Sequence, residues 1–411
     1  MGHYNADEEM TSLKVSDIGE LATYDPESGR INRKTNVDLI IEDGKVVAIS
    51  DALPQADRIL DASGRLVTPG FVDPHTHPVF AYPRADEFGM RMAGKSYQQI
   101  AEAGGGIKAS VKALREMPKS ELKESTVRRL KRFLFTGTTT IEAKSGYGLS
   151  TDSELKSLSV LDMAAKELPL GIVPTFLGAH DFPVEYAGDR QGYVDLICDK
   201  MIPAVSEQGI AEFCDVFCEE GWFDVESSKR ILEYGREHGL KSRLHADEFA
   251  PSGAAELAAE VGAFSADHLM HVSNFGIEQM SQAGVIAVLL PGTTFFLGKD
   301  TYAPARKLID AGVEVALSTD FNPGSSSTQS MPFIITLACI YLGMTVEESF
   351  IAATYAAAKS LGRAETIGAL SPGMVADLIV WDLKRLEEIP YHVGANRVSR
   401  LFKSGEEVLL R

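Results

Sequence analysis

The sequence is poor in cysteine, in basic charge and in long apolar runs. Its 411 residues include four cysteines, too few for a disulfide framework, and we expect free thiols in a reducing compartment, hence a cytoplasmic protein. Only 40 basic residues stand against 58 acidic ones, and a net charge of −18 argues against nucleic acid or an anionic membrane as partner. No run approaches the roughly 18 apolar residues that span a bilayer. The glycine run at 104–106 lacks the Lys-Ser/Thr of a phosphate-binding loop.

Short apolar runs alternate with helical patterns from about residue 65 onward. There are eight such runs: LVTPGFVDPHTH, TTTIEAKSGYG, GIVPTFLGAH, AEFCDVFCE, LKSRLHADE, AFSADHL, VIAVLLPGT and VEVALSTDFN. Between them, apolar residues recur at helical spacing, and glycines stand where each helix should end. One of these helices opens with Thr151 and Glu154, whose spacing predicts a capping box.

Eight strands that alternate with helices favour a (β/α)8 TIM-like barrel, with an open doubly wound sheet as the alternative. The two ends of the chain do not follow this rhythm. Residues 36–50 predict a hairpin that turns at Asp43-Gly44, and ADLIVWDL and VSRLFKSGEEVLL predict further strands near the C-terminus. We therefore expect an α/β protein in which the barrel, residues 68–367, is inserted in a small β-sandwich domain built from residues 1–67 and 368–411.

Polar residues gather where the predicted barrel strands end, which is the face on which barrel enzymes place their active sites. Five of the nine histidines belong to this group, as do several carboxylates. The residues are His75, His77, Glu142, Lys144, Tyr147, His180, His245, Glu248, Asp267, His268, Asp320 and Asn322. A barrel that used histidine only for structure would not segregate it in this way.

Three histidines and an aspartate would suit a single borderline-soft divalent ion whose open coordination position is left for water. Such an ion lowers the pKa of water from about 15.7 towards about 7. Glu248 follows His245 by three residues, so its carboxylate could shuttle the proton. His268 could stabilise charge on the attacked oxygen or assist protonation. The pattern therefore predicts metal-dependent hydrolysis.

The order of these residues resembles the amidohydrolase superfamily. The motifs RADEF, AGGGI, EAKSGYGL, FLGAH, LHADE, SADHL, LLPGTTFFLGK and STDFNPGSS resemble, within it, the imidazolonepropionase family of histidine degradation. The resemblance runs from about residue 66 past residue 326, and ADLIVWD and IPYH continue it. It implies hydrolysis of the ring amide of 4-imidazolone-5-propanoate to N-formimidoyl-L-glutamate. The chain differs from the family pattern at 181–183 and 327–329, near the expected pocket.

The resemblance also implies a role for each matching residue. The metal ligands would be His75, His77, His245 and Asp320, holding one divalent ion per chain, zinc in the first place and iron in the second. The catalytic residues would be Glu248 and His268 as an acid/base pair, together with Asp320. Contacts with substrate or product would come from Arg84, Tyr147, His180, Glu248, Asn322, Gly324 and Ser325. Lys144 is not the carbamylated lysine of binuclear relatives, because that lysine belongs to strand four.

Two other functions remain open on the sequence. A nucleobase deaminase could use His245, Glu248 and the histidine of strand six equally well, and it would release ammonia. A non-catalytic scaffold is the alternative from another class, but such relatives usually lose metal ligands. A homodimer is expected by analogy alone.

Overall fold

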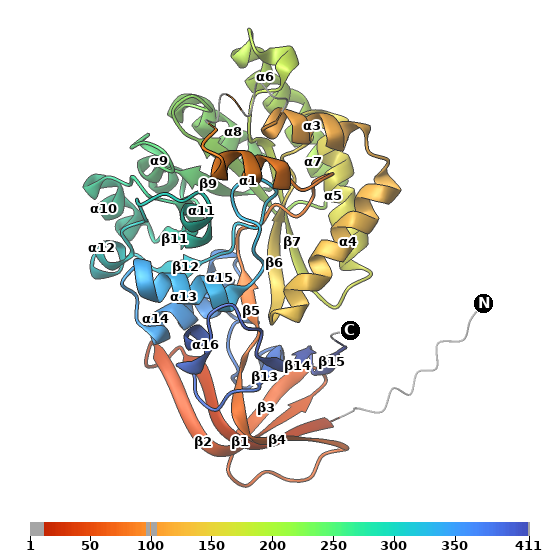
Figure 1. The fold of residues 1–411 in the computed structure, drawn as a ribbon, viewed down its shortest axis with the longest axis vertical. Coiled ribbons are helices and arrows are strands. Elements are labelled where there is room, and N and C mark those ends of the chain that lie inside the picture. Colours follow the sequence, from red (N-terminus) through yellow and green to blue (C-terminus); the bar gives the residue numbers. More distant parts are fainter. Residues whose placement is uncertain (1–11, 96–98, 100–104, 410–411) are drawn as a thin grey trace, which may run out of the picture.

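A computed structural model describes residues 12–95, 99 and 105–409. Its larger sheet contains eight parallel strands, β5 to β12, and their order in the sheet is the same as their order in the sequence (Figure 1). The strands are β5 (Phe71–Asp73), β6 (Thr138–Lys144), β7 (Gly171–Ala179), β8 (Phe213–Cys218), β9 (Lys241–Ala246), β10 (Ser265–His268), β11 (Ile286–Leu289) and β12 (Val315–Leu317). The eight predicted strands and the barrel fold class are confirmed. The open doubly wound sheet is wrong, because the strand order never reverses and Thr76 bridges Phe321 beyond the two end strands.

Side chains join the first and last strands of this sheet. Asp73, at the end of β5, accepts hydrogen bonds from the hydroxyls of Ser318 and Thr319, which follow β12. Beyond it, the backbone N–H of His77 donates to the carbonyl of Phe321 over 2.8 Å. The barrel is therefore closed at the level where the polar residues of the strand ends lie.

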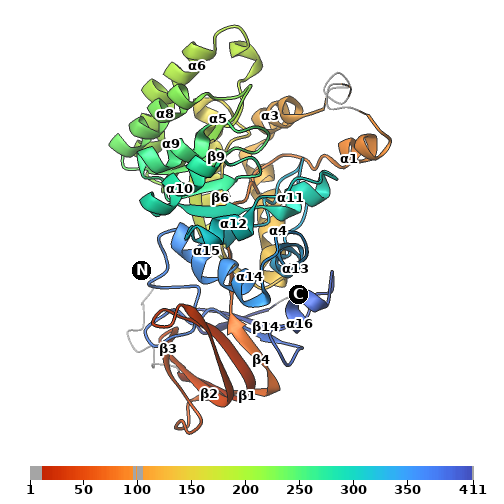
Figure 2. The same ribbon diagram turned by 90° about the vertical axis from the view of Figure 1, so that its left-hand side faces the viewer.

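Helices follow the strands and cover the barrel from outside (Figures 1 and 2). Those described are α1 (Ala85–Met92), α3 (Ile107–Glu116), α4 (Lys119–Phe135), α5 (Thr151–Ala165), α6 (Arg190–Leu196), α7 (Ile202–Gln208), α8 (Val225–Glu237), α9 (Ala254–Val261), α10 (Asn274–Ala283), α11 (Pro291–Phe296), α12 (Ala305–Asp310), α13 (Met331–Tyr341), α14 (Val346–Ala352), α15 (Tyr355–Ser360) and α16 (Glu388–Tyr391). As predicted, glycines end several of them: Gly262 and Gly284 adopt the left-handed conformation after α9 and α10.

The two ends of the chain form a separate mixed sheet of seven strands, at the base of Figure 2. Its strands are β1 (Ser12–Asp25), β2 (Arg30–Glu42), β3 (Lys45–Ser50), β4 (Arg58–Pro69), β13 (Leu378–Trp381), β14 (Val398–Lys403) and β15 (Glu406–Val408). The predicted hairpin is present, since Glu42 pairs with Lys45 across the turn. A buried apolar cluster that includes Val15, Leu39 and Leu378 supports this sheet.

The chain passes from one sheet to the other at Gly70, between β4 and β5. A Cβ atom at this position would lie 2.4 Å from a side-chain carbon of Thr139, so only glycine allows β4 to continue directly into the barrel. Because β4 extends to Pro69, it crosses the boundary expected after residue 67. The domain boundaries at 67/68 and 367/368 stay a prediction.

The described residues also bear on the absences noted in the sequence. All four cysteines are free thiols, three of them buried. No described helix combines the length and apolar character needed to cross a bilayer. The glycine run that was excluded as a phosphate loop begins at Gly104, outside the described residues.

Candidate metal centre and active site

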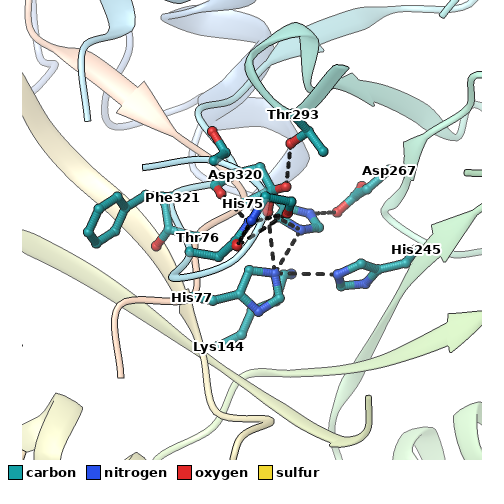
Figure 3. A network of polar contacts seen from close by, with 12 residues as sticks. His75, Thr76, His77, Lys144, His245, Asp267, Thr293, Asp320 and Phe321 are labelled. Atoms are coloured by element: carbon teal, nitrogen blue, oxygen red, sulfur yellow. Dashed lines mark hydrogen bonds and ion pairs between the residues drawn. The ribbon is translucent and has the colours of Figure 1, made fainter. Parts of the chain in front are cut away.

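The four expected metal ligands meet at the carboxyl ends of three barrel strands (Figure 3). His75 and His77 follow β5, His245 lies near the end of β9, and Asp320 follows β12. All four side chains are buried. Because a parallel barrel brings its carboxyl ends together on one face, residues almost 250 positions apart become neighbours.

The donor atoms of these residues gather around Nε2 of His77. Nε2 of His77 lies 3.2 Å from Nε2 of His75 and 3.4 Å from Nε2 of His245. Oδ1 of Asp320 lies 3.5 Å from Nε2 of His77 and 3.7 Å from Nε2 of His75. Ligand atoms about 2.0–2.1 Å from a shared tetrahedral ion are about 3.3–3.4 Å apart, so the separations around Nε2 of His77 suit a zinc-like ion.

Buried carboxylates fix the orientation of two ligand histidines. Nδ1 of His75 lies 2.6 Å from Asp267, and Nδ1 of His245 lies 3.0 Å from Asp215. A carboxylate that accepts the Nδ1 proton leaves the Nε2 lone pair directed at the shared point, which is the tautomer a metal requires. Each aspartate therefore supports one ligand histidine.

Burial sets the protonation of the ligand set. It lowers the pKa of His75 and His77 well below the usual value, with Lys144 and the neighbouring histidines adding to the effect. Burial also raises the pKa of Asp320 to about 7, although a hydrogen bond from the hydroxyl of Thr293 lowers it in part. Neutral imidazoles are the form that binds metal, and a bound cation would favour the Asp320 carboxylate.

Glu248 and His268, the expected acid/base pair, stand beside the ligands. Oε2 of Glu248 lies 3.7 Å from Nε2 of His268, and both side chains are buried. Burial, with the nearby Asp320 charge, raises the pKa of Glu248 to about 8. The backbone of His268 has a φ of 80°, which residues other than glycine rarely adopt. Such strain is typical of functional positions. A carboxyl with this pKa can exchange a proton near neutral pH.

A cavity of about 510 Å³ opens over this group. It is lined by ligands, by the acid/base pair and by every residue expected to contact substrate or product: Arg84, Tyr147, His180, Glu248, Asn322, Gly324 and Ser325. Asn322 shapes one wall, because its side-chain oxygen accepts the backbone N–H groups of Gly324 and Ser325 over 2.8 and 2.7 Å. The structure thus brings all the sequence-predicted site residues together.

Glu154 was assigned wrongly as the partner of a capping box. Helix α5 has no side-chain cap, and Glu154 is instead buried against the preceding loop. Its carboxylate accepts the backbone N–H groups of Gly146, Gly148 and Leu149 over 2.8–2.9 Å. These groups flank Tyr147, so Glu154 shapes the loop that carries a cavity residue. The glycines of EAKSGYGL, which leave backbone N–H groups accessible, were the signal for this contact.

The two departures from the family pattern do not line this cavity. Asp181, Phe182 and Pro183 border a neighbouring hollow. The side chain of Gln329 points elsewhere, since its amide nitrogen donates to the backbone carbonyl of Arg129 in α4, and the backbone carbonyl of Gln329 accepts from the Thr136 hydroxyl. Neither segment lines the cavity, although the second begins two residues after Ser325, which does.

Comparisons with known proteins agree with this geometry. A model of the amidohydrolase family matches residues 224–408. Curated proteins named imidazolonepropionase are similar over most of their length: that of Shouchella clausii is 52% identical and aligns over 86% of this chain and 78% of its own, and that of Alkaliphilus metalliredigens is 44% identical over 97% and 98%.

Solved structures share the fold at low identity. A triazine hydrolase variant superposes with a TM-score of 0.77 at 17% identity and covers 97% of this chain and 94% of its own. An adenosine deaminase from Xanthomonas campestris with bound zinc gives a TM-score of 0.71 at 17% identity, over 97% of this chain and 92% of its own.

The barrel, its terminal sheet and the cluster of histidines with an aspartate are those of an amidohydrolase. At 44–52% identity over most of its length, the chain belongs to the imidazolonepropionase family. The family and the buried His/Asp groups together support a metal cofactor.

Proposed function

We propose that the protein hydrolyses the ring amide C–N bond of 4-imidazolone-5-propanoate and forms N-formimidoyl-L-glutamate, a step of histidine degradation. One observation carries the proposal: the expected ligands His77, His245 and Asp320 line the same cavity as Glu248 and Arg84. A cyclic amide needs an activated water, a group that moves protons and a means of holding its carboxylate. The cavity offers residues for each.

We propose one metal ion per chain, zinc in the first place and iron in the second, held by His75, His77, His245 and Asp320. When bound, the ion would supply Lewis acidity, which lowers the pKa of water from about 15.7 towards about 7. His75 and His245 are held for this purpose by Asp267 and Asp215. Fixed ligands give the site its shape before substrate enters.

Glu248 would take the proton of the attacking water and deliver it to the departing ring nitrogen. Water adds to the ring carbonyl carbon, the C–N bond breaks, and the former carbonyl becomes a carboxylate. His268 lies 3.7 Å from Glu248 and would stabilise the charge that develops on the carbonyl oxygen. Burial of both side chains strengthens these electrostatic effects.

Arg84 would bind the propanoate group, because a guanidinium matches the planar geometry of a carboxylate. Tyr147 and His180 would contact the ring, and Asn322, Gly324 and Ser325 would contact the product. His180 is suited to a neutral contact, since burial lowers its pKa to about 3. It stacks on His77, with ring centroids 5.2 Å apart, and so connects the substrate side of the cavity with the ligand set.

A nucleobase deaminase remains the second candidate, because the same ligands and Glu248 would serve attack on an amidine carbon. The deciding experiment mixes the metal-loaded protein with freshly generated 4-imidazolone-5-propanoate and follows loss of the ring absorbance, with ammonia measured in parallel. Rapid decay without ammonia, abolished in Glu248→Ala, supports the proposal. No decay, with ammonia released from nucleobases, supports a deaminase.

A cytoplasmic location and a homodimer belong to the same proposal. The three buried free cysteines suit a reducing compartment. Native mass measurement of the purified protein would test the dimer directly.

A further inference from the structure

We propose that Lys144 is a positioning residue for the metal centre: its ammonium holds Asp215, which orients His245, and Glu142, which binds the segment between His75 and His77. The inference rests on the metal site of the proposed function, but it does not depend on which substrate the protein hydrolyses. Lys144 ends β6, the second barrel strand, and its side chain lies beneath the ligand set in Figure 3.

The ammonium of Lys144 lies between two acidic side chains. Nζ is 2.8 Å from Oε1 of Glu142 and 2.7 Å from Oδ2 of Asp215. All three side chains are fully buried. Glu142 and Lys144 are two residues apart on one strand and therefore point to the same face, into the barrel. Asp215 reaches them from β8.

Asp215 transmits this contact to His245. Its Oδ1 accepts a hydrogen bond from Nδ1 of His245 over 3.0 Å and another from the backbone N–H of the same residue over 3.2 Å. Its other oxygen is the one that Lys144 holds. The position of the ammonium thus fixes the carboxylate plane, which in turn fixes the ring of His245.

Glu142 and the backbone of Lys144 transmit a second contact, to the segment between His75 and His77. Oε2 of Glu142 accepts the backbone N–H of Thr76 over 3.2 Å, and the Thr76 hydroxyl donates to the Glu142 carbonyl over 2.6 Å. The backbone N–H of Lys144 donates to the Thr76 carbonyl over 2.9 Å. Thr76 is therefore bound on every polar group, and the histidines on either side of it are directed inward.

A second cation, Arg243, supports the carboxylate of Asp267, which orients His75. Nη2 of Arg243, on β9, lies 3.3 Å from Asp267 and 2.8 Å from the Pro74 carbonyl, and Asp267 supports His75. Lys144 and Arg243 thus divide the support of the ligand set between them. This division lets the contribution of Lys144 be measured with the Asp267 contact intact.

Two physical effects of Lys144 on the metal have opposite signs. A positive charge near the site repels a bound cation, so its removal should tighten metal binding if repulsion dominates. Removal also releases Asp215 and Glu142 from their fixed positions, which should weaken binding if positioning dominates. Loss of an outer support of this kind typically costs about ten- to a hundredfold in metal affinity. We expect weakening, because Nζ directly contacts the carboxylates of Asp215 and Glu142, which support the ligand segments.

The test is the metal affinity of Lys144→Met, measured by competition with a chelator on protein stripped of metal. We expect Zn²⁺ and Co²⁺ to bind about ten- to a hundredfold more weakly than to the unaltered protein. The visible spectrum of the Co²⁺-loaded variant should change as well, because it reports ligand geometry. Unchanged or tighter binding would overturn the proposal.

Lys403→Met is the matched control. Lys403 forms a partly buried ion pair with Asp377, 2.6 Å long, and also contacts Thr140, in the first half of β6. Its removal should lower stability and leave metal affinity and the Co²⁺ spectrum unchanged. A loss of affinity in this control equal to that of Lys144→Met would mean that general destabilisation explains both, and the proposal would fall.

The double variant Glu142→Gln/Lys144→Met provides a second test if the single variant does not fold. It removes one buried anion with the cation, so no additional uncompensated charge remains. Binding should still weaken about tenfold or more, because Asp215 has lost its partner. Since these measurements need no substrate, a protein that binds metal normally but fails to open the imidazolone ring would contradict the proposed function alone.

Discussion

The guanidinium of Arg84 donates two hydrogen bonds to the carboxylate of Glu87, from Nε to Oε1 over 2.8 Å and from Nη2 to Oε2 over 2.5 Å. Arg84 immediately precedes α1 and Glu87 lies in its first turn. Glu87 also accepts the backbone N–H of Gly106, which precedes α3. Arg84 is therefore both a member of a partly buried ion pair and a cavity residue, held in one orientation before a ligand enters.

Arg84→Ala should raise KM for 4-imidazolone-5-propanoate far more than it lowers kcat. The side chain binds a carboxylate remote from the reacting carbonyl, so it contributes to ground state and transition state alike. A charge-assisted contact contributes about 1.5–3 kcal/mol, which corresponds to roughly a ten- to hundredfold rise in KM. Steady-state kinetics on the metal-loaded protein provide the measurement.

Arg306→Ala is the control for this change. Arg306 pairs with Glu348 on the exposed surface, and its loss should leave both kinetic constants unchanged. The assignment of Arg84 would be refuted by an unchanged KM, or by a fall in kcat with KM constant.

Glu248→Gln should lower kcat by about a hundred- to ten-thousandfold, the usual contribution of a positioned proton-transfer group. The amide keeps the size of the side chain but cannot accept the proton. Metal content should stay at the wild-type level, because Glu248 is not in the proposed ligand set. Loss of metal together with activity would move Glu248 into that set and remove it from the proton-transfer role.

Much of the site could be predicted because strand ends carry distinctive residues. His75, His77, His245, His268 and Asp320 each stand where an apolar run stops, and parallel strands in a barrel place such positions on one face. The terminal sheet was predictable from alternating patterns around turn residues, as at Asp43-Gly44. Local sequence suffices wherever one element determines the position of a residue.

The support beneath the ligands could not be predicted in this way. Asp215 lies inside the apolar run FCDVFC. Only the closed barrel brings it to His245 on the neighbouring β9 and, across the barrel interior, to Lys144 on β6. Glu154 was misassigned because its spacing suits a helix cap, whereas its carboxylate binds the backbone N–H groups of the preceding loop instead. A charged residue within a buried strand signals a partner, but sequence alone does not identify that partner.

His77→Ala should abolish tight metal binding. Nε2 of His77 lies within 3.5 Å of a ligand atom of each of the other three expected ligands, His75, His245 and Asp320. Elemental analysis should find about one metal per chain in the unaltered protein and almost none in the variant. Because a metal binds the folded state, its loss should also lower Tm; saturation at a hundredfold excess over Kd stabilises by about 2.7 kcal/mol.

His238→Ala is the control for the ligand prediction. His238 follows α8 and contacts the carbonyl of Tyr234 over 2.8 Å, away from the ligand set. It should keep full metal content. Retention of metal in His77→Ala would overturn the site, whatever the activity of that variant.

Glu248→Gln should also change how stability depends on pH in the metal-free protein. Burial raises the pKa of Glu248 to about 8, whereas an unfolded glutamate titrates near about 4.3. The folded state thus binds this proton more tightly, so the carboxyl's contribution to stability is complete below about pH 4.3 and is lost as the pH rises through about 8. Glutamine does not titrate. In excess chelator, the free energy of unfolding of the variant should therefore rise relative to the unaltered protein between about pH 5 and pH 8, by about 1 kcal/mol or more. Urea unfolding at several pH values tests this, and a difference that stays constant across the range would show that Glu248 titrates alike in both states.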